Sequence, residues 1–379
     1  MIEYFSIKNY QVDLITLCKK NDKRDQGLQK LCNKISYIEH SLLMSVFFTL
    51  FRFFNLKPMQ VNFFYSPYMH KIVKKFTDSN EYDYVYFHLL RAGQYRKSIS
   101  TQAKLIIGMQ TSFTLNYKRL IKYAKNIFIK IFYFIELKLI QKLEPNIIND
   151  FDLATLISEK DMDSIGFKSE VDLEKILILP HGIDVKYFSR DSVYELKKNP
   201  FVITFPANFK SEANQDAASW LIEEIIPKLK LNLKNFKILM LGANPSKKIK
   251  DFSKFESFFS FTGYVDDLRD YLEKSSLIIN PVRVSSGMQN KVILGMSYGL
   301  PVLTTSTSIE GMKIPRDLVF ECPIDSEAFV KNIIGIYNMN STELNYRLSR
   351  AKKYVNEFWT WEHYLDKLEL KLKRLSEKN

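Results

Sequence analysis

The sequence is poor in the two residue types that most often build cross-links and metal sites. Its three cysteines, Cys18, Cys32 and Cys322, show no paired spacing, and its five histidines are scattered without an HxxxH pattern. These absences argue against a disulfide framework and against a zinc site. We therefore expect a reducing compartment and no resident metal.

Long hydrophobic segments are also missing. The N-terminus carries no basic-then-apolar signal sequence. The most apolar run, residues 42–56, is interrupted by Arg52 and is shorter than the roughly 20 residues that a spanning helix needs. We expect no transmembrane span and expect this run to be buried, with a membrane-facing element as the alternative.

Acidic residues are in deficit, because 42 Asp and Glu stand against 55 Lys and Arg and give a formal net charge of +13. Nucleic acid, an anionic membrane or a phosphate-bearing substrate would suit such a charge. Since no zinc-finger or RNP motif is present, we expect no nucleic-acid partner. Residues 116–144 interleave seven Lys and Arg with Ile, Leu, Phe and Tyr, which indicates a helix at a membrane interface. A core-facing helix with a solvated basic side is the alternative.

Short apolar runs alternate with helix-like segments along the chain. In the second half we expect strands at residues 201–205, 236–242, 276–281 and 301–305, and helices at residues 214–231 and 266–275. In the first half we expect buried strands at residues 12–17, 82–89, 103–109 and 151–158. This alternation predicts an α/β fold with doubly wound parallel sheets.

The alternation of strands and helices breaks at Pro180 and Gly182, which indicates a boundary between two domains. We expect an N-terminal domain at residues 1–178, a C-terminal domain at residues 179–357, and a last helix within residues 358–379. Packing of this helix back on the N-terminal domain is the prediction, and packing on the C-terminal domain is the alternative.

One segment of the second half has the composition of an anion site. Residues 282–305 read VRVSSGMQNKVILGMSYGLPVLTT, a polar loop that leads into a helix and then a strand. A helix start presents free N–H groups and the positive end of the helix dipole. Gly287 would let an anion approach the backbone, and Arg283 and Lys291 would add two cations. Ordinary capping by serine and glycine is the alternative.

Four neighbouring motifs favour the anion site over ordinary capping. They are HGID at 181–184, FPANFKSEAN at 205–214, FTGYVDDLRDYL at 261–272 and SIEGM at 308–312. In this order, with residues 280–305, they resemble the retaining glycosyltransferases of family 4, in the branch with GYVxDL and QNKVLEAM-type motifs. The resemblance implies the GT-B fold, in which two Rossmann-like domains face a cleft. The N-terminal domain would then serve the acceptor and the C-terminal domain the nucleotide-sugar.

The resemblance also implies roles for single residues. It makes Arg283, Lys291 and Glu310 the catalytic candidates, the first two as phosphate cations and Glu310, with Gly311, beside the donor sugar or ribose. The donor-binding candidates are Asn208, Lys210, Gly263, Tyr264, Val265, Ser286, Gly287, Met288, Gln289 and Asn290. Gly263 to Val265 would lie against the base, and residues 286–290 would offer backbone amides to the diphosphate. A strand-ending turn at Gly263, a solvated Lys291 and a capping Glu310 are the alternatives.

Three residues of the N-terminal domain are candidates for the acceptor side. His88 and Arg91 follow an expected strand, and Ser112 lies in GMQTSFTLN, residues 108–116, which resembles a segment of the same branch. For His88 and Arg91 the alternative is an ordinary polar surface.

Several positions depart from the family pattern. Its Glu-x7-Glu pair corresponds to Ser286 and Leu294, and a leucine cannot accept hydrogen bonds from ribose. Ala207 replaces a glycine near the phosphates, and Gly108 and Thr111 replace acidic residues of the branch. Residues 1–10 resemble the tail of the family's first helix, so we expect about 25 or more residues of the pattern, including its first strand, to be absent.

The expected activity is transfer of a sugar from a UDP- or GDP-sugar to a hydroxyl acceptor, with retention at the anomeric carbon and without a cofactor. An envelope, capsule or lipopolysaccharide glycan, or a lipid-linked precursor, is the expected acceptor. Such a protein would be cytoplasmic, with a peripheral contact to an anionic membrane at its inner face. The alternative is a GT-B pseudoenzyme that binds a nucleotide-sugar or a partner without turnover. The departures from the family pattern at Leu294 and Ala207 favour this alternative.

Overall fold

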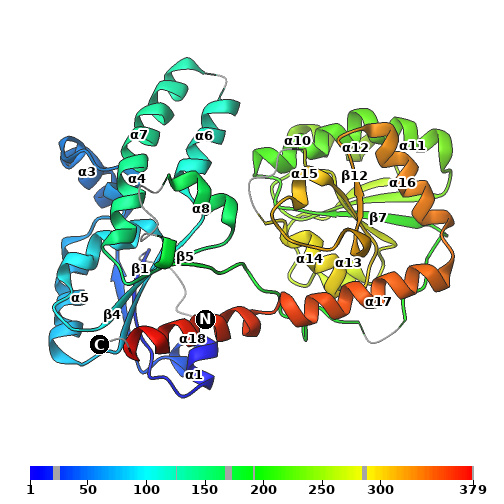
Figure 1. Ribbon diagram of the computed structural model, residues 1–379. Coiled ribbons are helices and arrows are strands. Elements are labelled where there is room, and N and C mark those ends of the chain that lie inside the picture. The colour runs from blue at the N-terminus through cyan, green and yellow to red at the C-terminus, as the bar shows by residue number, and fades with distance from the viewer. Residues whose placement is uncertain (20–25, 125, 167–172, 191–192, 284–287, 378–379) are drawn as a thin grey trace. The chain divides into compact units, whose positions relative to one another are not determined.

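The computed structural model describes residues 1–19, 26–124, 126–166, 173–190, 193–283 and 288–377. The chain forms two compact units (Figure 1). Unit 1 comprises Met1–Pro180 together with Tyr364–Asn379, and unit 2 comprises His181–His363. Each unit is described by itself.

Unit 2 contains a six-stranded sheet in which every pairing is parallel. Its strands, in spatial order, are β12 (Phe320–Cys322), β11 (Val302–Thr305), β10 (Leu277–Asn280), β7 (Phe201–Pro206), β8 (Phe236–Leu241) and β9 (Phe259–Phe261). The chain runs from β7 outward to β9 and then returns to β10 on the other side of β7. The point between β7 and β10 is a topological switch point, where open α/β sheets bind ligands beyond the carboxyl ends of the strands.

Helices lie between consecutive strands of this sheet and, in the case of α16 and α17, after its last strand. They are α10 (Glu212–Trp220), the π-helical turn η3 (Leu221–Ile225), α11 (Ile226–Asn232), α12 (Lys247–Phe255), α13 (Arg269–Leu272), α14 (Asn290–Ser297), α15 (Ser306–Ile309), η4 (Arg316–Leu318), α16 (Ser326–Asn338) and α17 (Ser341–Phe358). The central strands are buried on both faces, which is why they read as continuous apolar runs in the sequence.

Gly295 fixes how closely α14 lies on the sheet. A Cβ atom there would come within 2.5 Å of Val302 Cγ2 and 3.3 Å of Ile278 Cγ1, on β11 and β10. The absence of a side chain therefore lets α14 rest directly on these two strands. Its first residue then lies beside the carboxyl end of β10.

Unit 1 contains two parallel sheets. The first pairs β1 (Asp13–Cys18) with β2 (Lys34–Glu39), and the second orders β3 (Tyr84–His88), β4 (Lys104–Gln110), β5 (Leu153–Leu156) and β6 (Ile176–Ile178). Its helices are α1 (Ile2–Ile7), α2 (Gln26–Leu31), α3 (Leu42–Phe51), η1 (Phe53–Asn55), α4 (Met59–Phe63), α5 (Pro67–Ser79), η2 (Leu90–Ser98), α6 (Phe113–Tyr123), α7 (Ile127–Asn149) and α8 (Glu159–Ile165). In the part of the chain that the structure describes, no strand joins the two sheets.

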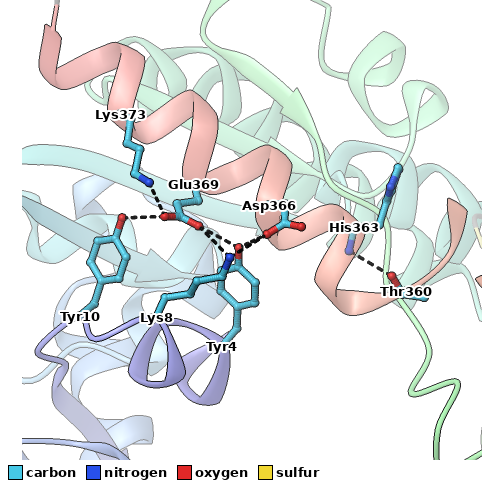
Figure 2. Close-up of polar contacts among 8 residues, drawn as sticks. All are labelled: Tyr4, Lys8, Tyr10, Thr360, His363, Asp366, Glu369 and Lys373. Atoms are coloured by element: carbon cyan, nitrogen blue, oxygen red, sulfur yellow. Dashed lines mark hydrogen bonds and ion pairs between the residues drawn. The ribbon is translucent and has the colours of Figure 1, made fainter. Parts of the chain in front are cut away.

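The last helix, α18 (Trp361–Glu377), begins in unit 2 and continues into unit 1, where it packs beside α1. Figure 2 shows the polar contacts that hold it there. Tyr4 and Tyr10 each donate a hydrogen bond to Glu369, at 2.9 and 3.1 Å, and Lys373 pairs with the same carboxylate at 2.6 Å. Both ends of the chain thus complete unit 1.

The expectation that residues 42–56 are buried is wrong. On α3 the buried side chains are Ser45 and Thr49, whereas Leu43 is 83% exposed and Phe51 is 74% exposed. Thr49 donates a hydrogen bond from its hydroxyl to the carbonyl of Ser45, so this buried hydroxyl has a partner within the helix and does not require water. Hydrophobicity alone did not reveal which face the helix turns inward.

The basic aromatic segment at residues 116–144 falls on two helices, α6 and α7, rather than on one. Among the described residues, no helix combines the length and the apolar character needed to cross a membrane.

Candidate functional site

Two strand ends and one helix start define the candidate site in unit 2. The carboxyl end of β7 leads into Ala207 and Asn208, and that of β10 leads into Val282 and Arg283. These strands are neighbours at the switch point. The helix that follows β10 is α14, so its start belongs to the same edge of the sheet.

A helix follows the polar loop, as the sequence predicted. Gln289 precedes the first helical residue, Asn290, and its side chain does not cap the helix. Met288 and Gln289 are half-buried, and Asn290 is exposed. Ser286 and Gly287, which we predicted to bind the diphosphate, lie outside the described residues.

Lys291 is a half-buried residue whose ammonium group has neutral hydrogen-bond partners. Its Nζ donates to Asn214 Oδ1 at 3.1 Å and to Gln289 Oε1 at 3.0 Å, and it lies 5.3 Å from the ring centre of Phe205. No carboxylate among the described residues pairs with it. Burial lowers the pKa of Lys291 to about 7. An uncompensated ammonium in this position favours an anionic ligand, which would supply the missing charge.

Arg283 is held by an acid. Its Nε and Nη2 donate to the two carboxylate oxygens of Asp216, at 3.0 and 2.6 Å. This hydrogen bonding to Asp216 raises the pKa of Arg283 above its usual value. The bidentate pairing with Asp216 fixes the plane of the Arg283 guanidinium. A guanidinium held in this way can bind a phosphate through N–H groups that the aspartate does not occupy.

Helix α10 brings the two cations together, because it supplies both Asn214 and Asp216. The sequence prediction did not single out either residue for a role. Asn214 was within a recognised motif, but Asp216 follows it without a signal of its own. Asn214 reaches Lys291 from α10, and Asp216 reaches Arg283.

Asn208 and Lys210 join the site through Asn214. The Nδ2 of Asn214 donates to the carbonyl of Asn208 at 2.8 Å, while its Oδ1 accepts from Lys291. The Oδ1 of Asn208 in turn accepts from the backbone N–H of Lys210 and from Asn244 Nδ2, both at 3.1 Å. The structure therefore connects the loop after β7 to the start of α14.

Gly263, Tyr264 and Val265 follow β9, at the same edge of the sheet. Gly263 has a φ of +79°, a region that suits glycine, and it forms a bridge with Gly242 at the end of β8. Gly242 is packed so tightly that a Cβ atom would lie 2.0 Å from the carbonyl oxygen of Ala207. Tyr264 is 79% exposed, which leaves its ring open to a ligand.

Glu310 and Gly311 end α15, after β11. Both are exposed, and Gly311 has a φ of +88°. The same short helix reaches Arg283, because Thr307 Oγ1 donates to the carbonyl of that residue at 3.3 Å. A buried Asn280 anchors it from β10, with Nδ2 donating to Thr304 and Ser308 at 3.0 and 2.9 Å.

The departure at Leu294 has a structural meaning. Leu294 is 8% exposed and belongs to the buried face of α14, so it contributes packing and no hydrogen bond.

In unit 1, His88 ends β3 and Arg91 lies in η2. His88 is exposed at the carboxyl end of its strand, where Gln110 Nε2 lies 3.5 Å from its Nε2. Partial desolvation of its ring lowers the pKa of His88, and the positive charge of Arg91 adds to the effect. Arg91 stacks on Phe64, with 4.0 Å between guanidinium carbon and ring centre.

Ser112 does not fit the acceptor-side prediction. It is fully buried and caps α6, accepting from the backbone N–H of Leu115 at 3.3 Å. Its own hydroxyl donates to Glu144 at 3.2 Å. The residue stabilises a helix start, and its hydroxyl is not open to a substrate in this structure. Within the described ranges, no three His, Cys, Asp or Glu side chains are arranged to hold a metal ion.

Comparison with known proteins agrees with this architecture. Residues 200–339 match the family described as Glycosyl transferases group 1. The chain is 22% identical, over 371 residues, to an "Uncharacterized 44.6 kDa protein in cps region" of Klebsiella pneumoniae, covering 94% of this chain and 89% of that protein.

Solved structures resemble the chain over nearly its whole length. Sucrose-phosphate synthase from Thermosynechococcus elongatus matches with a TM-score of 0.68 and 14% identity, over 100% of this chain and 92% of that one. HepE from Anabaena, in complex with UDP-glucose, matches with a TM-score of 0.65 and 12% identity, over 96% of this chain and 100% of that one. The chain therefore has the GT-B fold, and its unit 2 carries the region that matches group 1 glycosyl transferases.

Proposed function

We propose that this protein is a glycosyltransferase of the family 4 type, which moves a sugar from a nucleotide-sugar, a UDP- or GDP-sugar, to a hydroxyl acceptor with retention at the anomeric carbon. The observation that carries the proposal is Lys291, a half-buried lysine at the start of α14 whose described hydrogen-bond partners are two amide oxygens. A diphosphate bound there would supply the negative charge that balances this ammonium.

The donor site combines the residues around the switch point. Arg283 and Lys291 would neutralise the diphosphate, with backbone amides of residues 286–290 at the helix start. Asn208 and Lys210 would border the phosphates, residues 263–265 would receive the base, and Glu310 with Gly311 would lie near the donor sugar. HepE was solved with UDP-glucose, and its fold likeness supports this choice of ligand class.

Catalysis would depend on positioning and charge. In the front-face mechanism, the acceptor hydroxyl attacks the anomeric carbon on the side that the diphosphate leaves, and a leaving-group oxygen takes the acceptor proton. Arg283 and Lys291 would stabilise the negative charge that develops on that oxygen. The remaining contacts would hold donor and acceptor in the reactive geometry.

We propose an envelope glycan as the acceptor, either a capsule or lipopolysaccharide chain or its lipid-linked precursor. The relative from the cps region of Klebsiella pneumoniae supports a role in polysaccharide synthesis. We place the protein in the cytoplasm, with peripheral contact to the membrane on which such an acceptor grows.

Calorimetric titration with UDP-glucose, GDP-mannose and ADP-glucose tests the donor site. We expect one of them to bind, and Lys291→Ala and Arg283→Ala each to weaken it by about 1.5–3 kcal/mol, the range for hydrogen bonds to charged groups. Lys237→Ala, at an exposed position of β8, is the matched control and should bind normally. Unchanged affinity in both site variants would show that neither residue binds the donor.

Turnover separates the enzyme from the pseudoenzyme alternative. We expect slow hydrolysis of the bound donor, and NMR of the released sugar should show the anomeric configuration of the donor as the first product. An inverted first product would exclude retention. Binding without hydrolysis or transfer to any glycan acceptor would favour a protein that binds nucleotide-sugars without turnover.

A further inference from the structure

Helix α3 is built with its polarity reversed. The side chains that it turns toward unit 1 are Ser45 and Thr49, and those that it turns outward include Leu43, Phe47 and Leu50. Small polar residues at a helix contact and large apolar residues outside are the arrangement of helices that face lipid. A water-facing helix would show the opposite pattern.

The first half of α7 repeats this reversal. Ile127 is 62% exposed and Phe128 is 77% exposed, whereas the two glutamates of the helix, Glu136 and Glu144, are buried. Glu136 accepts from the backbone N–H of Met59 at 2.9 Å, at the start of α4, and the hydroxyl of Tyr117 on α6 lies 3.4 Å from it. The acids thus face the protein while the aromatic and branched side chains face outward.

Both elements lie at one end of unit 1. In Figure 1, α3 and the hairpin of α6 and α7 stand at the end of this unit that is remote from α1 and from the C-terminus. Together α3 and the first half of α7 expose far more apolar surface than single scattered side chains would. We call this the α3–α7 surface.

The helices that form this surface expose charge of one sign. The sequence has no acidic residue between Glu39 and Asp78, and again none between Asp83 and Glu136. Exposed lysines of α6 and α7 flank the apolar residues: Lys118, Lys122, Lys138 and Lys142. An apolar face whose own helices expose lysines and bury their acids complements a bilayer that contains anionic phospholipid, whose headgroups would pair with the lysines.

We propose that the α3–α7 surface inserts into the interfacial region of an anionic bilayer, with α3 as the main inserted element. The apolar side chains of α3 and of the first half of α7 enter the boundary between headgroups and acyl chains, and the lysines of α6 and α7 contact the headgroups. This inference rests on unit 1 alone and does not depend on the proposed transferase activity of unit 2.

Flotation with vesicles tests it. The full chain should float with phosphatidylcholine vesicles that contain phosphatidylglycerol, and much less with phosphatidylcholine alone. Leu43→Glu/Leu50→Glu should lower the partition coefficient at least roughly tenfold, because it places two charges in the inserted face. The matched control is Leu231→Glu/Phe255→Glu, whose positions in unit 2 are 85% and 84% exposed, and this variant should float like the unchanged protein.

A fluorescent reporter measures insertion directly. The three native tryptophans, Trp220, Trp359 and Trp361, all belong to unit 2. Phe54→Trp would add one just after α3, at a position that is 87% exposed. Its emission should shift to shorter wavelength, and brominated acyl chains should quench it, only when anionic vesicles are present.

Four outcomes would overturn the proposal. In the first, the full chain is absent from the floating fraction; in the second, the Leu43→Glu/Leu50→Glu variant floats like the unchanged protein. In the third, the emission of the Phe54→Trp variant does not shift. In the fourth, the unchanged protein is a dimer, the Leu43→Glu/Leu50→Glu variant is a monomer, and vesicles bind neither. The last outcome would assign the surface to a second copy of the chain. Donor titration of the same variants separates these failures from a failure of the proposed function.

If the α3 variant is poorly folded, Lys118→Gln/Lys122→Gln/Lys142→Gln replaces it. This change leaves every apolar side chain in place and should weaken flotation with anionic vesicles, most clearly at low salt. Flotation unchanged by the loss of three lysines would also contradict the proposal.

Discussion

Lys291 lies at the edge of the sheet with amide oxygens as its hydrogen-bond partners, and burial holds its pKa at about 7. A bound diphosphate would stabilise the protonated form and raise that pKa. Binding would then take up a proton above pH 7, and the affinity should fall by up to about tenfold per pH unit between pH 7 and 9.

Titration with UDP-glucose at several pH values measures this effect, because its diphosphate does not itself titrate near neutrality. Lys291→Arg keeps the charge at every pH and should give a nearly flat profile. A profile in the unchanged protein as flat as that of the arginine variant would show that Lys291 does not titrate in the free site.

The same residue should cost stability in the absence of ligand. Its folded pKa of about 7 lies below the unfolded value of about 10.4, so the unfolded chain binds more protons between these limits. The cost is complete below pH 7 and is relieved as the pH rises toward 10.4. Lys291→Met should therefore raise the free energy of unfolding more at pH 6 than at pH 9, which urea denaturation at the two pH values would measure. An equal gain at both would contradict a titrating Lys291.

Residue roles were only partly accessible from the sequence. Arg283 and Lys291 could be selected because a motif combined them with a helix start. Asp216, which orients Arg283, was not found, because an acid within an amphipathic helix carries no signal of its own. Ser112 was assigned to the acceptor side from its motif, yet its contacts with Glu144 and Leu115 make it a cap.

At the scale of elements, the start of α6 depends on a distant carboxylate. Glu144, on α7, accepts from the backbone N–H groups of Phe113 and Thr114, at 2.6 and 3.2 Å, and from the hydroxyl of Ser112. Burial raises the pKa of Glu144 above its usual value, so the acid resists ionisation more than a surface glutamate does.

Glu144→Gln should lower the free energy of unfolding by about 1–3 kcal/mol, because the amide turns an N–H toward these donors and leaves one unsatisfied. Urea denaturation checks this, with Glu357→Gln at an exposed position of α17 as the control. A variant as stable as the control would show that the cap contributes little.

The elements themselves were largely predictable in unit 2. Buried parallel strands read as apolar runs, so β7, β8, β10 and β11 follow the expected positions closely. Strands such as β2 and β12 were not expected, because β2 alternates with polar residues and β12 has three residues. The orientation of α3 could not be read from composition, since a run of large apolar residues does not say whether protein or another medium covers it.

At the scale of the whole molecule, unit 1 is closed by a helix from the far end of the chain. The neighbouring Lys373, followed by Tyr4 and Tyr10, holds the pKa of Glu369 below its usual value (Figure 2). Such a carboxylate stabilises the fold above its unfolded pKa of about 4.3, and this stabilisation is lost as the pH falls through the lower folded value.

Glu369→Gln should therefore destabilise unit 1 by about 1 kcal/mol at pH 7, and the difference from the unchanged protein should shrink below pH 4. Thermal unfolding at pH 7 and pH 3.5 measures both. Glu377→Gln, exposed in the last turn of α18, serves as the control. A deficit that persists undiminished at pH 3.5 would argue against ionisation as its source.

The discontinuous make-up of unit 1 has a consequence during biosynthesis. The ribosome releases Met1–Pro180 early, but Tyr4 and Tyr10 can meet Glu369 only after all of His181–His363 has been made. At roughly 5–20 residues per second, that delay is on the order of tens of seconds. Unit 2 can thus fold before unit 1 is complete. Until α18 has been synthesised, unit 1 lacks its last helix while the apolar face of α3 is already exposed.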